Sequence, residues 1–167
     1  MKILYQGSPG AYSHLAAKEL YPNAEIISCK TFDECFVKAE QDKNSRIIIP
    51  ESNRITGNIG IEYLIFKHRL NIYAEHFHRV EHNLLGMQGT KLKDIKNVYS
   101  HAQALSQCSE FIKKNNINEN VRADTAGSAA LISNNKNKND AAISSKLSAE
   151  IYKLDVIASN IENEKGN

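Results

Sequence analysis

Residues 97–114 read NVYSHAQALSQCSEFIKK and contain two patterns in succession. Residues 97–99 predict a short strand, and the segment from Ser100 to about residue 114 predicts a helix. Leu105 and Ile112 fall on one apolar stripe of that helix and are expected to pack against a sheet. The stretch therefore predicts one strand-helix unit of a layered fold.

The same order of signals is found elsewhere along the chain. Ser8 is the expected N-cap of the first helix, with Pro9 at its first position, and Thr31 with Glu34 predicts a capping box before the second. Strand-helix alternation predicts parallel sheets with helical crossovers, and therefore an α/β fold. Strands are predicted at residues 2–5, 24–28, 46–49, 120–123 and 141–144, and later helices at residues 126–132 and 145–152.

Two segments between these units are harder to assign from pattern. Residues 58–67 alternate apolar and polar side chains as a strand does, but their length and their position between strands favour a helix. Residues 70–85 predict one or two strands that could cross between lobes. The solvated loop expected at residues 134–139 is rich in asparagine and lysine.

Length and composition limit the classes of function. With 167 residues, 41% of them hydrophobic, the chain can bury one good core or two small cores joined by a hinge. The net charge of +2 does not provide a basic face for nucleic acid, although it suits a small anionic ligand. Three cysteines are an odd number without framework spacing, which predicts reduced thiols.

Membrane and export signals are not expected in this sequence. The opening MKILYQGSPGAYSH contains a four-residue apolar stretch, which is too short for the apolar region of a signal peptide. No apolar run approaches the length needed to span a membrane. We therefore expect cytoplasmic localisation, and neither a membrane nor a nucleic-acid partner.

Four junctions after predicted strands carry small or hydroxylated residues. In open parallel sheets, ligands bind beyond the carboxyl ends of strands, where helix N-termini present free N–H groups. Several such junctions in one place would form a carboxylate cradle, whereas ordinary helix capping explains any one of them. The junctions are Ser8-Pro9-Gly10, Ser52-Asn53 through Gly57, Ser100-His101, and Asp124-Thr125-Ala126-Gly127.

Polar side chains form a second feature of the segment after residue 99. Ser100, Gln103 and Gln107 are spaced so that they share one stripe of the predicted helix. A hydroxyl and two amides on one face can hydrogen-bond a polar ligand without adding charge, and a solvent-facing stripe has the same spacing. Both interpretations remain open on spacing alone.

His76, His78 and His82 fall on one face of the strand expected at residues 70–85. A shared metal ion would require all three to converge. In a continuous strand, His82 lies roughly 13 Å beyond His78 at about 3.3 Å per residue, which is too far. We therefore predict surface or hydrogen-bonded histidines and no metal site.

Four segments together resemble the prephenate dehydratase family. The opening ILYQGSPGAYSHLAA is similar to the family's N-terminal strand-turn-helix, and YSHAQALSQC resembles its Ser-His-Pro-Gln-Ala-Leu-x-Gln-Cys signature, with Ala102 where proline is common. ADTAGSAA is similar to the family's Asp-Thr-Ala segment, and AAISSKLSAEIYKLDVIASNIE resembles the alanine-rich region that precedes its closing motif. The resemblance extends over essentially the whole chain.

The resemblance implies a fold and a reaction. The fold is two α/β lobes of mostly parallel sheet, similar to periplasmic binding proteins, with a ligand cleft between the lobes. The reaction is the decarboxylative dehydration of prephenate to phenylpyruvate in phenylalanine biosynthesis, without a metal or organic cofactor. The implied division is residues 1–76 for lobe 1, 77–158 for lobe 2, and 159–167 for the start of a return to lobe 1.

The resemblance also implies a set of residues for the dicarboxylate substrate. Ser100, Gln107 and Thr125 are expected contacts, and Asn53 is expected to contribute from the junction after the third strand. The full set of expected substrate-binding residues is Gly10, Ala11, Ser52, Asn53, Ser100, Gln103, Gln107 and Thr125.

The chain departs from the family pattern in two places. The family usually reads Pro-Ile-Glu-Asn-Ser where residues 50–54 read PESNR, so that Ser52 replaces the glutamate and Arg54 the serine. Glu51 can compensate only if the backbone slips by one residue, and Arg54 can pair with a substrate carboxylate or face solvent.

The second departure concerns the family's Thr-Arg-Phe motif, which carries the expected catalytic threonine. This motif would fall just past Asn167, so we expect the chain as written to turn over prephenate poorly, either as a fragment or as an enzyme that has lost activity. The alternatives are an arogenate dehydratase and a catalytically silent module that binds small carboxylates. A homodimer is a further expectation.

Overall fold

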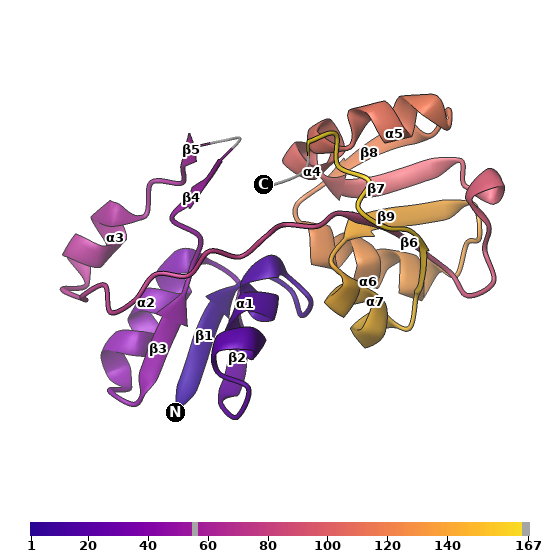
Figure 1. The fold of residues 1–167 in the computed structure, drawn as a ribbon. Coiled ribbons are helices and arrows are strands. Elements are labelled where there is room, and N and C mark those ends of the chain that lie inside the picture. Colours follow the sequence, from indigo (N-terminus) through magenta and orange to yellow (C-terminus); the bar gives the residue numbers. More distant parts are fainter. Residues whose placement is uncertain (55–56, 165–167) are drawn as a thin grey trace. The chain divides into compact units, whose positions relative to one another are not determined.

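The computed structural model describes residues 1–54 and 57–164, and these divide into two units by their internal contacts. The first unit contains Met1–Ser8 and Tyr12–Arg79, and the second contains Pro9–Ala11 and the chain from Val80 onward. Figure 1 shows that each unit has a sheet and helices of its own. The lobe boundaries expected from the sequence stay predictions.

A three-stranded parallel sheet forms the centre of the first unit. Its order is β2-β1-β3, with β1 (Lys2–Gln6) between β2 (Glu25–Cys29) and β3 (Ser45–Ile48). These strands confirm the predictions for this part of the chain to within one residue at each end. Leu4 packs with Cys29 on one face, whereas the Tyr5 ring stacks on His14 with ring centroids 4.9 Å apart.

Two helices follow the first two strands of this sheet. The prediction that Ser8 caps a helix with Pro9 in its first turn was wrong, because α1 (Tyr12–Leu20) begins only after Gly10. Gly10 has a φ of +95°, which is incompatible with a right-handed helix. Before α2 (Phe32–Gln41), the backbone N–H of Glu34 donates to Thr31 Oγ1 over 3.1 Å, which confirms Thr31 as the N-cap. The return bond of the predicted capping box goes elsewhere, because the Glu34 carboxylate accepts from the backbone N–H of Lys30.

The chain after β3 forms a small ribbon and a short helix. β4 (Ser52–Asn53) pairs with β5 (Gly57–Asn58) in antiparallel orientation, and α3 (Glu62–Lys67) confirms the helix expected within residues 58–67. No helix or strand is assigned to residues 70–82, so the prediction of strands across 70–85 was wrong except at its end. A strand requires a neighbouring strand, which an alternating pattern alone cannot supply.

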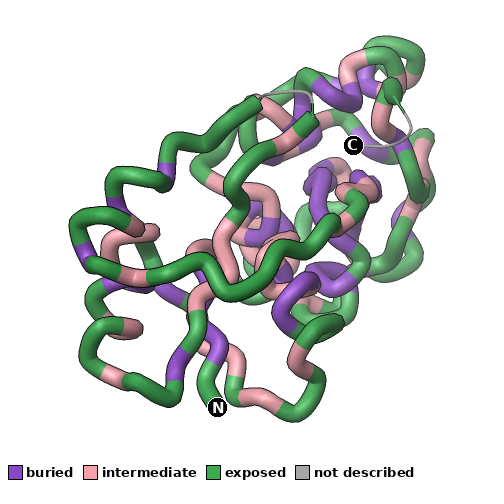
Figure 2. Tube along the Cα trace, turned by 60° about the vertical axis from the view of Figure 1, so that its left-hand side comes forward, coloured by how far each residue is buried: buried purple, intermediate pink, exposed green. Residues whose placement is uncertain are grey.

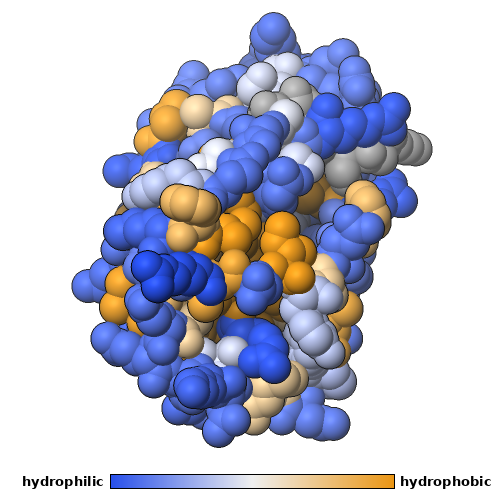
Figure 3. Space-filling view, turned by 90° about the vertical axis from the view of Figure 1, so that its left-hand side faces the viewer, coloured by the Kyte–Doolittle hydropathy of each residue, from blue (hydrophilic) through white to orange (hydrophobic). Residues whose placement is uncertain are grey.

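The first unit leaves large apolar side chains at its surface. Phe66 on α3 is 87% exposed, and Phe77 in the segment after α3 is 89% exposed. Figure 3 views the molecule from this side and shows apolar side chains among hydrophilic ones. In Figure 2 the exposed chain of residues 71–77 contrasts with the buried middle of β1.

A five-stranded mixed sheet forms the centre of the second unit, in the order β10-β6-β9-β7-β8. β9, β7 and β8 are parallel, whereas β6 runs antiparallel to both of its neighbours. The strand β10 was not expected from the sequence. The strands are β6 (Asn83–Gly86), β7 (Asn97–His101), β8 (Asn118–Arg122), β9 (Asp140–Ser144) and β10 (Asp155–Ala158).

Helices cover both faces of this sheet. On one face Val98 and Ile143 pack with Leu105 and Ile112 of α4 and α5, and on the other Ala142 and its neighbours pack with α6 and α7. The resulting three layers confirm the α/β architecture. The helices are α4 (Ala102–Gln107), α5 (Ser109–Lys114), α6 (Thr125–Asn135) and α7 (Lys146–Tyr152), and a 3₁₀ turn, η1, spans Leu92–Asp94.

Within the described ranges, each helix is too short or too polar to cross a lipid bilayer.

Candidate functional site

Three adjacent strands of the second unit end at one edge of its sheet. β9, β7 and β8 are parallel neighbours, so their carboxyl ends meet, and each runs directly into a helix. The caps of these helices are Ser145, His101 and Asp124, whose side chains each accept a hydrogen bond from a backbone N–H of the first turn. The capping expected at Asp124 is therefore confirmed, whereas at the Ser100-His101 junction the cap is His101 and not the Ser100 hydroxyl. Ligand binding at these junctions stays a prediction.

Ser100 lies on a strand and not on a helix, contrary to the predicted helical stripe. It is the fourth residue of β7 and is fully buried, and its Oγ donates to the carbonyl of Ile143 over 2.7 Å. The strand continues through Ser100 because that residue pairs in register with Val121 of β8. The hydroxyl therefore holds β7 against β9.

Gln103 and Gln107 are the two members of the predicted stripe that lie on α4. Gln107 is 9% exposed, and its Oε1 lies 2.7 Å from Nε2 of the buried His82. An amide oxygen can only accept, so His82 donates from Nε2 and is held in one tautomer. This contact fixes the amide plane of Gln107 and turns its nitrogen away from His82.

Burial controls the protonation of His82. Loss of solvent contact lowers the pKa of His82, although its contact with Gln107 and the carboxylate of Glu162 act in the opposite direction. Glu162 Oε2 accepts from the backbone N–H of His82 over 3.1 Å. Burial therefore favours the neutral imidazole, which still donates from Nε2 to Gln107.

The turn that contains Gly10 is bound to the start of α7. The carbonyl of Gly10 accepts from Ser145 Oγ over 2.6 Å and from Ser148 Oγ over 3.1 Å. A Cβ on Gly10 would lie 2.9 Å from Cα of Ser148, closer than ordinary contact. Gly10 and the half-buried Ala11 therefore lie in the second unit, next to the helix that follows β9.

The remaining predicted residues are divided between the units. Thr125 is the first residue of α6 and is half-buried at the carboxyl end of β8. Ser52 and Asn53 form β4 in the first unit, where Ser52 is exposed and Asn53 half-buried. The structure therefore brings Gly10, Ala11, Ser100, Gln103, Gln107 and Thr125 into one unit, and Ser52 and Asn53 into the other.

Several polar residues at this strand edge were not predicted from the sequence. Ser144 Oγ donates to Ser148 Oγ over 2.8 Å, next to the contacts with Gly10. Arg122 ends β8 opposite His101, and its guanidinium lies 5.3 Å from the centre of the Tyr99 ring. Ser145 is recognisable as an N-cap before an apolar run, but the contact of Ser148 with Gly10 joins distant parts of the sequence.

The three cysteines are buried free thiols. Burial raises the pKa of Cys108 to about 12, and burial together with the neighbouring Cys29 raises the pKa of Cys35. Thiols with a raised pKa are poor nucleophiles near neutral pH. Catalysis by Cys35 or Cys108 as a nucleophile is therefore disfavoured, and the polar edge offers hydroxyls, amides and the exposed guanidinium of Arg122.

The comparisons with known proteins agree with the fold and the motif order. A sequence model of the prephenate dehydratase family matches residues 3–167. Arogenate dehydratase 2 of Petunia hybrida and arogenate dehydratase/prephenate dehydratase 1, chloroplastic, of Arabidopsis thaliana are each 38% identical to the chain over 168 residues. These matches cover 100% of this chain and 43% of each relative, so the chain spans less than half of their length.

Solved structures show the same architecture. A prephenate dehydratase of Staphylococcus aureus has a TM-score of 0.82 at 26% identity, with 100% of this chain and 63% of that chain covered. GqqA, described as a novel type of quorum quenching acylase, has a TM-score of 0.92 at 32% identity, with 98% of this chain and 60% of that chain covered.

The fold and the polar strand edge define an α/β domain of the kind that binds small polar molecules. The match over residues 3–167 is more specific, and the chain belongs to the prephenate dehydratase family. The resemblance noted in the sequence is thereby confirmed.

Proposed function

We propose that the chain is a dehydratase domain that binds prephenate and supports its conversion to phenylpyruvate in phenylalanine biosynthesis. The observation that carries the proposal is the buried pair of Gln107 and His82, at the strand edge that also holds Ser100 and Thr125. Family membership supports the reaction. The cleft between lobes and the contribution of Ser52 and Asn53 stay predictions.

The proposed reaction is a loss of carbon dioxide and water from prephenate. The bond between the ring and its carboxylate breaks and releases carbon dioxide, the electron pair enters the ring, and the ring hydroxyl takes a proton and leaves as water. Aromatisation drives the reaction, so the protein must hold two carboxylates and donate a hydrogen bond or proton to the departing hydroxyl. The Gln107 amide nitrogen, oriented by His82, is the proposed donor to the substrate.

Titration calorimetry with prephenate tests this proposal. Gln107→Ala is expected to weaken binding roughly tenfold or more, because a buried polar partner of the ligand is lost. Gln88→Ala is the matched control, since Gln88 is exposed and follows β6, which ends beside the amino end of β9. Equal affinities for the wild type and Gln107→Ala would contradict the assigned role.

A turnover assay separates a dehydratase from a silent binding module. We expect phenylpyruvate to form when prephenate is added to the wild type, and more slowly in Gln107→Ala. Binding of prephenate without any formation of phenylpyruvate would favour the silent module. Parallel titrations with arogenate test the second substrate, which the names of the Petunia and Arabidopsis relatives suggest.

An acylase activity is a second candidate, favoured by the likeness to GqqA. Hydrolysis of an acyl amide requires an activated nucleophile. Ser145 and Ser148 are buried and donate to the carbonyl of Gly10, an arrangement that holds a turn and does not activate a hydroxyl. Release of fatty acid from an N-acyl amide substrate, lost in Ser145→Ala, would support the acylase over the dehydratase.

We also propose a cytoplasmic location and a homodimer for this protein. The three free thiols suit a reducing compartment, in support of a cytoplasmic location, which fractionation of cells that express the native gene would test. The exposed Phe66 and Phe77 support a homodimer, because oligomer interfaces bury such side chains. Light scattering coupled to size exclusion is expected to give twice the chain mass, and a monomer at all concentrations would refute the dimer.

A further inference from the structure

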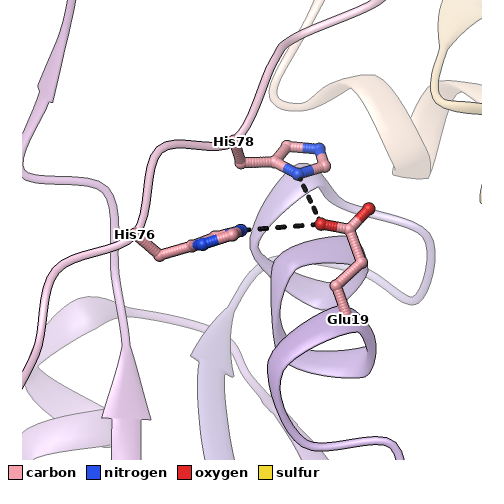
Figure 4. Close-up of side chains that lie close together, drawn as sticks. All are labelled: Glu19, His76 and His78. Atoms are coloured by element: carbon pink, nitrogen blue, oxygen red, sulfur yellow. Dashed lines mark hydrogen bonds and ion pairs between the residues drawn. The ribbon is translucent and has the colours of Figure 1, made fainter.

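Two histidines and a glutamate converge in the first unit. Glu19 lies in the last turn of α1, whereas His76 and His78 lie in the segment that follows α3. Figure 4 shows both imidazole rings directed at the same carboxylate. One short stretch of chain therefore supplies two of the three groups, and α1 supplies the third.

The distances in this group match those of a metal site. Glu19 Oε2 lies 3.0 Å from Nδ1 of His78 and 3.5 Å from Nε2 of His76. One ligand atom from each residue lies within 4.8 Å of the others. Donor atoms around a tetrahedral zinc ion are roughly 3.4 Å apart, given bonds of about 2.05 Å.

The surroundings of the group also favour a cation. A carboxylate in the last turn of a helix lies near the negative end of the helix dipole, which a bound cation would offset. The side chain of Glu19 is 49% exposed, so an ion held there can keep a water ligand. Nε2 of His78 is buried without a hydrogen-bond partner among the described residues, which leaves Nδ1 as the polar contact of that ring.

We infer that Glu19, His76 and His78 form a site for a divalent transition metal, with zinc as the expected ion. Two imidazoles and a carboxylate suit zinc, whereas magnesium and calcium prefer oxygen ligands alone. The sequence predicted no metal site, because a set made of His76, His78 and His82 is too widely spaced in a strand. The structure places His82 against Gln107 and supplies Glu19 as the third ligand.

A bound ion would join α1 to residues 70–82. This segment has no helix or strand, and Phe77, between the two histidines, is 89% exposed. Metal binding would therefore restrict the backbone around Phe77, where a protease could otherwise cut the chain. The site would act as a clamp within the first unit.

Titration of tag-free, chelator-treated protein with zinc chloride is the first test. We expect one ion per chain, and affinity roughly tenfold or more lower in Glu19→Gln, His76→Ala and His78→Ala. Glu75→Gln is the matched control, because Glu75 is an exposed carboxylate beside His76 and is not part of the group. Cobalt is expected to give the visible absorption of tetrahedral coordination in the wild type and in Glu75→Gln, and to lose it in the three ligand variants.

Cleavage by chymotrypsin after Phe77 is the second test. Zinc is expected to slow this cleavage in the wild type and in Glu75→Gln, but not in His76→Ala. Cleavage of His76→Ala in the presence of zinc also shows whether zinc inhibits the protease itself. Zinc binding that is unchanged by all three ligand substitutions would overturn the site. Binding that depends on the ligands but leaves cleavage unchanged would overturn the clamp.

Discussion

The two units of the chain bury their sheets to very different extents. In the second unit, every residue of β6 and β9 is buried, and helices cover both faces of the sheet. In the first unit, the central strand β1 is well buried, but β2 and β3 are mostly half-buried or exposed. The second unit therefore has the larger hydrophobic core within the described chain.

This difference in burial predicts a difference in stability between the two units. Hydrophobic stabilisation scales with the apolar area removed from water, so the second unit is expected to be the more stable. Most of the predicted substrate residues lie in this unit, where buried hydrogen bonds hold Ser100 and Gln107 in place. The first unit instead carries an irregular segment, exposed aromatic rings and the inferred zinc site.

The largest expected effect comes from removing core volume in each unit. Ile143→Ala in β9 is expected to lower the free energy of unfolding by about 3 kcal/mol, whereas Ile47→Ala in β3 should cost about 1 kcal/mol. Ile143 is fully buried, whereas Ile47 is only half-buried. Urea unfolding followed by circular dichroism measures both, and equal losses would contradict the comparison.

Replacement of Gly10 tests the turn bound to α7. Gly10→Ala is expected to cost about 2–3 kcal/mol, because a positive φ and a close approach to Ser148 combine. Gly89→Ala is the control, since Gly89 has a φ of +74° but open space around it, and should cost about 1 kcal/mol. Similar melting temperatures for the two variants would show that the packing of the turn on α7 is unimportant.

Ser100→Ala separates a structural role from a binding role. Loss of its buried hydrogen bond to Ile143 is expected to cost about 1–2 kcal/mol of stability. Ser106→Ala, an exposed position on α4, should change stability by less than about 0.5 kcal/mol. If Ser100→Ala weakens prephenate binding but leaves the free energy of unfolding unchanged, the serine contributes mainly to ligand binding and not to the stability of the sheet.

The smallest effect concerns the protonation of His82. Burial lowers the pKa of His82 below its ordinary value of 6.5, so the unfolded chain binds more protons there than the folded chain as the pH falls below 6.5. The stabilising contribution of neutral His82 is present above pH 6.5 and is lost on acidification. His82→Gln should flatten this part of the stability profile between pH 7 and 5, and an unchanged slope would contradict the assignment.

Much of the fold could be predicted because local patterns and tertiary pairing agree. The strands at residues 2–5, 24–28 and 141–144 combine β-forming side chains with a following cap, such as Thr31 or Ser145. Ser100 was misassigned because a neighbouring strand extends β7 by two residues, and a sequence window carries no signal for that. The prediction of strands in residues 70–82 was wrong because their strand-like pattern has no neighbouring strand to pair with.

The candidate site was predictable only in part. Gln107 and Thr125 lie in motifs that can be recognised in the sequence, and the structure places Gln107 at the end of α4 and Thr125 at the start of α6. The contact between Gly10 and Ser148 joins residues 138 positions apart, and His82 approaches Gln107 from a different strand junction. Such partners depend on topology, so no local pattern reveals them.

The central claim is that prephenate binds at the carboxyl edge of the second unit's sheet. A titration with prephenate followed by ¹H–¹⁵N correlation spectroscopy tests this claim most directly. We predict that the largest shifts fall at residues 100–107, 124–128 and 144–148, with little change at Gln88 and Gly89. Shifts confined to the opposite edge, or no saturable shifts at all, would contradict it.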